Sequence, residues 1–287
     1  MKRPRLRTLI VAPFLLFGVF YIGLALVIVF DDAVVEPLTP PVADMATIAI
    51  FGASGTAGDG ILKAALADPA VETIHVITRR STPRIAAGAE TGKLIATQHL
   101  DYLDYAALKE TLKGVDAVFW ALGTSSIGVD EDLYVKIHVD FPMAFVREWR
   151  EASERDAISF HYISSSDISA DSRAMWARQK YRAEEELIGF ANGSKLKVIA
   201  YRPDYIGPTA QESHLGQELA YAFFAPVMAA VRAEAIGEAM LEATARGGEF
   251  SNGERVSTRR IRLLSEAYRR RQTDAPGVPV ATPGAKR

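Results

Sequence analysis

From residue 47 onward, short apolar runs alternate with longer stretches in which apolar residues recur at helical spacing. The runs are five to eight residues long and rich in β-branched and aromatic side chains, which is typical of strands buried on both faces. Most of the stretches between them are long enough to form a helix. Six strands are therefore predicted, over residues 47–51, 73–78, 94–99, 115–122, 158–164 and 196–201.

Between these strands, helices are predicted over residues 57–67, 131–152 and 172–190, where the helical spacing is clearest. Apolar strands that take turns with helices form a parallel sheet covered on both sides. The sequence therefore predicts an α/β fold, built as a Rossmann-type doubly wound parallel sheet. This domain is expected to span residues 47–271.

The pattern becomes helical after Pro208, and the C-terminal end of the chain differs again. A small helical C-terminal region, over about residues 209–271, is expected to lie against the substrate. Residues 272–287 are rich in Pro, Gly and Thr and are predicted to be a disordered tail. Three helices are predicted within the helical region, over residues 212–231, 234–246 and 257–271.

A long apolar run precedes the first strand. Residues 9–30 carry no charge, and as a helix they would span roughly 33 Å, enough to cross a hydrocarbon core of about 30 Å. Basic residues lie in segment 1–8, and residues 31–46 have the composition of a linker. We therefore expect a single-pass N-terminal transmembrane anchor in a lipid bilayer. A cleaved signal peptide fits less well, because the run exceeds the usual 7–15 residues and no small-x-small site follows it.

The side of the membrane that holds the domain stays open. The basic N-terminus is expected to remain in the cytoplasm, which sends the rest of the chain across the membrane. The domain, however, has the features of a protein that uses a cytosolic cofactor. These two expectations conflict, and the sequence does not decide between them.

The composition of the chain excludes several classes of binding and catalytic site. The 287 residues carry a net charge of −2, which argues against a dedicated nucleic-acid-binding protein. There is no cysteine, so thiolate metal sites and a cysteine nucleophile are excluded. The five histidines show no spacing typical of metal ligands, and no metal is expected. Residues 9–30 account for most of the apolar excess, so the remainder has the composition of a soluble domain.

The sharpest local signal is the sequence GASGTAG, which runs from Gly52 to Gly58. It follows the first predicted strand directly and opens the first predicted helix. Glycines at such a junction let the backbone turn tightly and approach a pyrophosphate, while the helix N-terminus supplies free N–H groups. A tight turn without a ligand is the alternative, but the position at the start of a βαβ unit favours dinucleotide binding.

The end of the second predicted strand bears on which dinucleotide is bound. An NAD site places an acidic residue there for the ribose 2′-hydroxyl, whereas a 2′-phosphate requires arginine. Here Thr78 is followed by Arg79 and Arg80, and no acid is present. NADP is therefore expected rather than NAD, although the basic pair would also suit a solvated surface.

Several short motifs occur in one order along the chain: FGASGTAG, TRR, ALGTS, YISS, a lysine on a predicted helix and YRPDYIGP. In this order they resemble the motifs of atypical short-chain dehydrogenases/reductases, in particular the NAD(P)H-binding NmrA-like and Tat-interacting protein 30 kDa-like group. The resemblance covers about residues 47–270, and the predicted anchor lies outside it.

The resemblance implies NAD(P)(H) binding and assigns roles by matching position. Asp101 would lie near the adenine, although on its own it is equally a helix cap. Ser165 stands where the family has its active-site serine, and Lys180 would hold the nicotinamide ribose as the second catalytic residue. The remaining cofactor contacts that it implies are Gly52, Ser54, Gly55, Thr56, Ala57 and Gly58 at the pyrophosphate, Arg79 at the 2′-phosphate, Ala121, Leu122 and Gly123 at the adenosine ribose, and Pro203 at the carboxamide.

One departure from the family affects the expected chemistry. The family's Tyr-x-x-x-Lys reads here Trp176-Ala-Arg-Gln-Lys180. An indole N–H donates a hydrogen bond but does not act as an acid or base near neutral pH. Tyr162 and Tyr205 fall near strand ends, but no motif supports either as a replacement. Lys180 itself has an alternative role as a surface lysine paired with Glu184 one turn later.

Two functions are therefore expected from the sequence. The first is a membrane-anchored NADP-dependent oxidoreductase that acts on a small carbonyl or hydroxyl substrate with an altered active site. The second is a non-catalytic NADPH-binding redox sensor or scaffold. A nucleotide-sugar epimerase or dehydratase fits less well, because it also needs the tyrosine.

Overall fold

A seven-stranded sheet forms the centre of the protein. The computed structural model describes residues 15–23, 45–209, 221 and 230–274. Its strands lie in the order β3-β2-β1-β4-β5-β6-β9, and every neighbouring pair is parallel. The strands are β1 (Thr47–Phe51), β2 (Thr73–Thr78), β3 (Leu94–Gln98), β4 (Ala117–Trp120), β5 (Ile158–Ile163), β6 (Leu196–Arg202) and β9 (Glu254–Ser257).

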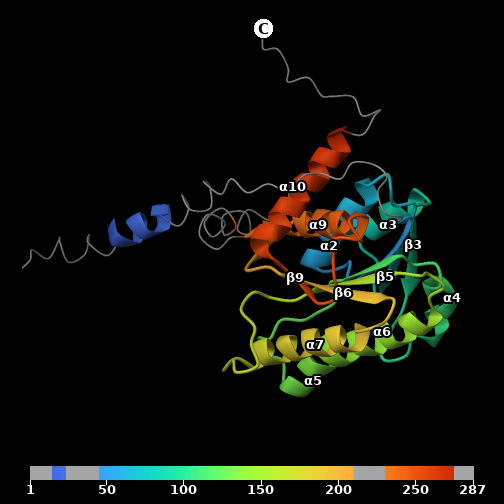
Figure 1. The fold of residues 1–287 in the computed structure, drawn as a ribbon, viewed down its shortest axis with the longest axis horizontal. Coiled ribbons are helices and arrows are strands. Elements are labelled where there is room, and N and C mark those ends of the chain that lie inside the picture. The colour runs from blue at the N-terminus through green and yellow to red at the C-terminus, as the bar shows by residue number, and fades with distance from the viewer. Residues whose placement is uncertain (1–14, 24–44, 210–220, 222–229, 275–287) are drawn as a thin grey trace, which may run out of the picture.

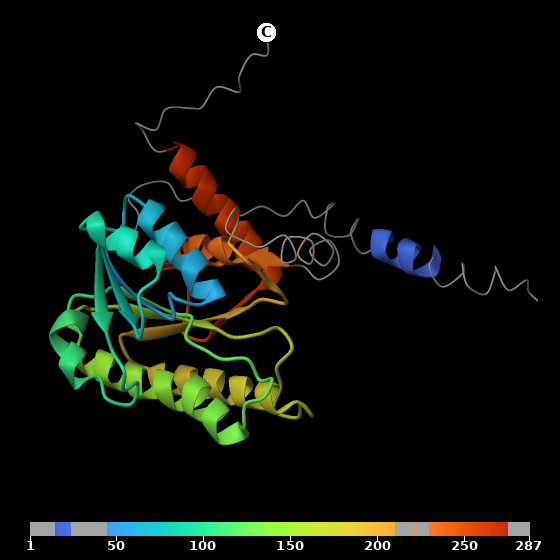
Figure 2. The same ribbon diagram turned by 180° about the vertical axis from the view of Figure 1, so that it is seen from behind.

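Helices cover both faces of this sheet, as Figures 1 and 2 show from opposite sides. On one face lie α2 (Thr56–Ala67), α3 (Pro83–Glu90), α9 (Ala233–Ala245) and α10 (Thr258–Asp274). On the other face lie α4 (Lys109–Leu112), α5 (Glu131–Val135), α6 (Phe141–Ala152) and α7 (Met175–Ala191). A short 3-10 helix, η1 (Ala106–Leu108), precedes α4.

The helix layers create two apolar cores, one on each face of the sheet. Because successive side chains of a strand point to opposite faces, each buried strand contributes to both cores. In β1, Ile48 and Ile50 pack with residues of α2 and α9, whereas Ala49 and Phe51 pack with residues of α6. This is why the strand is a continuous apolar run with no polar alternation.

The strand order reverses at β1, which lies between β2 and β4. The chain therefore winds outward in both directions from this strand. In open α/β sheets a crevice forms at such a point, beyond the carboxyl ends of the two central strands. The loops after β1 and β4 are thus expected to border a ligand site.

The predicted α/β architecture is confirmed, and all six predicted strands are present. Strand β9 is a seventh that the pattern does not predict, because only Val256 of its four residues is buried. The region over residues 209–271 is not purely helical. Besides β9, it contains β8 (Val231–Arg232), which pairs in parallel with β7 (Ile206–Gly207).

Three helical predictions are modified. The helix predicted over 131–152 is interrupted by a π-helical turn, η2 (Lys136–Asp140), between α5 and α6. Helix α10 continues to Asp274, three residues into the predicted tail, and Thr273 Oγ1 donates to Arg270 O in its last turn. The helix predicted over 212–231 lies almost entirely outside the described residues, and its end at Val231 belongs to β8.

Of the predicted anchor, only residues 15–23 are described, and they are helical. The rest of segment 9–30 and most of the predicted linker lie outside the described residues. Within the part of the chain that the structure describes, every helix is too short or too polar to cross a bilayer.

Candidate functional site

The glycine-rich loop joins β1 to α2 and is held tightly against the end of β4. Gly52 has a φ of +77°, and a Cβ there would lie 2.5 Å from the carbonyl carbon of Ala121. A Cβ on Gly58 would lie 2.1 Å from Gly52 O. Both positions therefore require glycine for the loop to close on itself and on β4.

Gly55 differs from these two glycines. Its φ is −99°, and the nearest atom to a Cβ there would be Gly52 O at 3.5 Å, which is ordinary van der Waals contact. The packing of the protein itself therefore does not require glycine at position 55. Gly55 is the N-cap of α2, and no side chain of the described residues caps this helix end.

A cavity of about 150 Å³ opens beside this loop at the carboxyl ends of β1, β2 and β4. Seven of the residues predicted to bind the cofactor line it: Gly52, Ser54, Gly55, Arg79, Ala121, Leu122 and Gly123. Three residues that were not predicted line it as well: Thr78, Arg80 and Tyr102. No carboxylate is among these described lining residues.

The two arginines at the cavity are exposed, and neither makes an ion pair within the described chain. Thr78 shapes the turn that carries them, because its Oγ1 donates to Arg80 O at 2.8 Å. Tyr102 forms a wall and stacks on Phe141 with ring centroids 5.4 Å apart. Burial raises the pKa of Tyr102, and the charge of Arg79 lowers it in part.

Several predicted contacts lie outside this cavity. Asp101 is exposed, and its Oδ1 accepts a hydrogen bond from the Leu103 backbone N–H at 3.0 Å, as a turn-forming residue does. Thr56 and Ala57 lie in the first turn of α2, and Gly58 is buried beneath the loop. The predicted adenine contact of Asp101 thus stays a prediction.

Lys180 is held at the end of β5. Its Nζ donates to Ile163 O at 2.8 Å, and the ammonium lies 5.5 Å from the ring centre of Tyr162. The alternative pairing with Glu184 is wrong. The Glu184 carboxylate is fully buried and accepts from Arg202 and Arg255 instead.

Burial lowers the pKa of Lys180 to about 8, and the negative charge of Glu184 opposes this shift. The lysine therefore loses its proton at a lower pH than an exposed lysine does. This environment distinguishes it from the exposed lysines of the protein.

Ser165 lies in the loop after β5 and Trp176 lies on α7, and the side chain of neither makes a hydrogen bond within the described residues. Ser165 directly follows Ser164, which is buried and whose hydroxyl has no hydrogen-bond partner in the described structure. Trp176 lies on α7 one turn before Lys180 and is partly buried. Pro203 is buried after β6, and its carbonyl accepts from Ser166 N at 3.3 Å.

Tyr162 does not replace the missing tyrosine. It is fully buried, its hydroxyl donates to His138 O at 3.3 Å, and burial raises its pKa well above the ordinary value. A phenol in such a position is a poor acid or base at neutral pH.

His138 links this region to the cavity. It lies in the π-helical turn, and its Nε2 lies 3.2 Å from Thr124 N and 3.1 Å from Thr124 O, so that it accepts from the N–H in one tautomer and donates to the carbonyl in the other. A Cβ on Gly123 would lie 2.8 Å from His138 Cε1, so the ring lies directly beneath the loop that lines the cavity. Burial and the charge of Lys180 lower the pKa of His138 to about 3, and the ring is neutral at pH 7.

Fold comparison defines the class of protein. No family model matches the chain. A short-chain dehydrogenase/reductase from Serratia marcescens aligns with a TM-score of 0.57 at 16% identity, over 74% of this chain and 95% of that one. BdcA, solved in complex with NADPH, aligns with a TM-score of 0.56 at 14% identity, over 74% and 91%. The fold is that of the short-chain dehydrogenases/reductases.

Sequence relatives define the family. The fmp52 protein of Emericella nidulans, which is named as mitochondrial, is 30% identical over 65% of this chain and 78% of its own length. The fmp52-1 protein of Aspergillus oryzae is 32% identical over 59% and 69%. The chain belongs to the fmp52 family, within the atypical short-chain dehydrogenases/reductases.

Proposed function

We propose that this protein is a membrane-anchored, NADP(H)-dependent oxidoreductase that acts on a small carbonyl or hydroxyl substrate. The observation that carries this proposal is the cavity in which the glycine-rich loop meets Arg79 and Arg80. Neither arginine has a carboxylate partner in the described chain, and the cavity lining is free of acidic side chains among the described residues.

The residues present fit a dinucleotide. Gly55 is not required by packing, so its missing side chain leaves room for a ligand to approach the backbone. The uncapped N-terminus of α2 offers N–H groups and a positive dipole end to a pyrophosphate. Arg79 would bind a ribose 2′-phosphate, and without an acid to accept from a 2′-hydroxyl the site favours NADP over NAD.

The chemical step depends on few side chains. A bound nicotinamide would supply or accept the hydride. Lys180 would hold the ribose and keep its proton available, because its pKa is about 8. Ser165 would orient the reacting carbonyl. Trp176 does not donate a proton near neutral pH, so water or another group must complete the proton transfer.

A second function, a non-catalytic NADPH-binding sensor or scaffold, is favoured by one observation, Trp176. The fold and the cavity are retained in this alternative, while the acid–base residue is lost. Lys180 weighs against it, because a pure sensor has less need of a buried lysine with a lowered pKa.

The membrane anchor over residues 9–30 is part of the proposal. In the described helix over 15–23, six large apolar side chains are exposed, namely Leu15, Leu16, Phe17, Val19, Phe20 and Ile22. Such a surface is unfavourable in water and suits lipid. Protease access to the C-terminal end in sealed vesicles tests which side of the membrane holds the domain.

The decisive experiment is dinucleotide binding to the full-length protein in lipid nanodiscs. We expect NADPH fluorescence to shift on binding and NADPH to bind more tightly than NADH. If neither dinucleotide binds, both functions fail together. Turnover against aldehydes, ketones and quinones then separates them: activity that Lys180→Ala abolishes supports the enzyme, whereas activity that appears only in Trp176→Tyr supports the sensor.

A further inference from the structure

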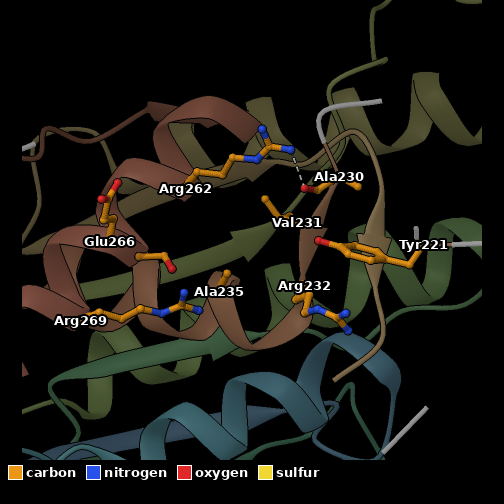
Figure 3. A pocket seen from close by; sticks show the side chains of 9 residues that line it. Tyr221, Ala230, Val231, Arg232, Ala235, Arg262, Glu266 and Arg269 are labelled. Atoms are coloured by element: carbon orange, nitrogen blue, oxygen red, sulfur yellow. Dashed lines mark hydrogen bonds between the residues drawn. The ribbon is translucent and has the colours of Figure 1, made fainter. Parts of the chain in front are cut away.

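A second cavity, of about 470 Å³, lies between α9, α10 and β8 and is separate from the glycine-rich loop. Figure 3 shows the side chains around it: Arg262 and Arg269 extend from α10 toward the side on which Tyr221 lies, and Glu266 comes from the same helix. Together with Ala230, Val231, Arg232, Ala235 and Ser265, these residues form its wall.

The wall combines an apolar side with a basic side. Tyr221, Val231 and Ala235 offer apolar surface, and the guanidinium of Arg232 lies over the Tyr221 ring at 4.4 Å from its centre. Three of the lining side chains are arginines, and only one, Glu266, is a carboxylate. The cavity is thus suited to a ligand with an apolar part and a negative charge.

Two of these lining charges are already neutralised. Glu266 accepts from Arg270 at 2.7 Å, and Arg270 lies outside the cavity wall. Arg269 pairs with Glu238 at 2.9 Å, and Glu238 also accepts from the buried Ser265 hydroxyl. Neither pair leaves a net charge in the cavity.

Arg262 has no such partner. Its Nη2 donates to Ala230 O at 2.7 Å, the contact drawn as a dashed line in Figure 3. Within the described residues it makes no ion pair and no other hydrogen bond. A partly buried guanidinium with unused donors is costly unless an anion completes it, because a planar guanidinium binds carboxylate or phosphate through two parallel hydrogen bonds.

We infer that this cavity binds an anionic ligand, a carboxylate or phosphate ester joined to an apolar or aromatic group, with Arg262 at the negative charge. The apolar group would lie against Tyr221, Val231 and Ala235. The inference concerns binding alone and does not depend on the proposed oxidoreductase function.

The position of the cavity relates it to the sheet edge. Val231 N donates to Tyr205 O at 2.9 Å, and Tyr205 follows Pro203 by two residues. Val231, which lines the cavity, is therefore bonded directly to the segment that follows the carboxyl end of β6. A ligand here would lie near the crevice beyond the strand ends without occupying the cavity at the glycine-rich loop.

Fluorine NMR of three small probes on the full-length protein in nanodiscs tests this inference, with empty nanodiscs as the reference. The probes are 4-fluorophenyl phosphate, 4-fluorobenzoate and the neutral 4-fluorobenzyl alcohol. We expect at least one anion to bind about tenfold or more tightly than the alcohol, the ratio typical of a charge-assisted hydrogen bond. Equal affinity for anion and alcohol overturns the inference, as does no anion binding up to roughly 10 mM.

Variants locate the binding. Arg262→Gln keeps a donor for Ala230 O but removes the charge, and we expect it to weaken anion binding about tenfold. Arg260→Gln removes the same charge from the same helix at an exposed residue that lies outside the wall and contacts Phe250 instead, so it is the matched control and is expected to change nothing. Ala235→Leu fills the apolar side and is expected to block the probes even where Arg262→Gln is poorly folded. Unchanged binding in both Arg262→Gln and Ala235→Leu places the anion elsewhere and rejects the site.

NADPH binding measured on the same samples distinguishes failure of the anion site from failure of the proposed oxidoreductase function. Arg262→Gln and Ala235→Leu are expected to leave NADPH affinity unchanged. If NADPH does not bind but the anionic probes do, the proposed function fails and the anion site stands. If the probes do not bind but NADPH does, the reverse holds.

Discussion

The ammonium of Lys180 donates a hydrogen bond of 2.8 Å to the carbonyl oxygen of Ile163, the last residue of β5. This contact fixes the first half of α7 to the edge of the sheet where the ligand crevice opens. Glu184, on the same helix, accepts hydrogen bonds from two arginines and not from this ammonium. Burial of this ammonium is therefore expected to cost stability.

Replacing Lys180 with Met tests whether burial of the ammonium lowers the stability of the protein. Because the pKa falls from 10.5 in the unfolded chain to about 8 in the folded protein, the unfolded state binds more protons between these values. Wild-type stability therefore rises with pH across this window, and below pH 8 the lysine is destabilising. We expect Lys180→Met to raise Tm at pH 7, by roughly 2–4 °C for each kcal/mol relieved, and the advantage to shrink towards pH 10. A Tm difference that is the same at both pH values contradicts this.

Gly55 and Gly58 are expected to respond differently to alanine. At position 55 a Cβ meets no atom closer than 3.5 Å, so Gly55→Ala is expected to leave stability unchanged and to weaken NADPH binding about tenfold. At position 58 a Cβ would lie 2.1 Å from a backbone oxygen, so Gly58→Ala is expected to cost about 1–3 kcal/mol or more. Urea unfolding and NADPH titration of both variants measure this contrast.

Arg79 is expected to determine the preference between the two dinucleotides. Arg79→Ala removes a charge-assisted contact to a 2′-phosphate, and we expect NADPH affinity to fall about tenfold or more while NADH affinity stays the same. Arg80→Ala is the neighbouring comparison at the same cavity. Equal losses for NADPH and NADH in Arg79→Ala would show that this arginine does not read the 2′-position.

His138 is expected to make the protein sensitive to acid. Its pKa is lowered to about 3 in the folded state from 6.5, so the unfolded chain binds more protons between these values and stability falls as pH decreases below 6.5. His138→Gln keeps an amide that can hydrogen-bond to the Thr124 backbone but does not titrate. We expect the loss of stability between pH 7 and pH 5, measured by urea unfolding, to be smaller in this variant than in the wild type.

Truncating the same side chain tests its positioning role. His138→Ala removes the hydrogen-bond partner of the Thr124 backbone and opens space beneath Gly123, which is expected to cost about 2–4 kcal/mol. Because Gly123 lines the cavity, NADPH affinity is expected to fall as well, and His138→Gln to restore most of it. Full NADPH affinity in a folded His138→Ala protein would separate the histidine from the site.

The sequence predicts the central strands and the glycine-rich loop well, because both depend on local pattern. Strand β9 escapes prediction because one buried residue, Val256, does not make an apolar run. Tyr102 escapes for another reason: its role as a cavity wall arises from its stacking on Phe141, which is distant in the chain. The family resemblance assigns the adjacent Asp101 to the adenine instead, but Asp101 is exposed and does not line the cavity.

The surroundings of Lys180 are also beyond sequence reasoning. The spacing of Lys180 and Glu184 suggests a helical ion pair, and only the fold shows that Arg202 and Arg255 occupy the carboxylate. The role of His138 likewise depends on a π-helical turn inside what the pattern predicts as one continuous helix. Both features arise from competition among partners that are far apart in the chain.

The buried carboxylate of Glu184 connects two properties that look unrelated. Through Arg255 it forms an ion pair with the edge strand β9, in which Val256 alone of the four residues is buried. Its negative charge also raises the pKa of Lys180, against the larger lowering that burial causes. Arg255 on the edge strand and Lys180 on α7 thus depend on the same carboxylate: loss of Glu184 would remove the ion pair of the strand and would also lower the pKa of Lys180 further, because burial would then act unopposed.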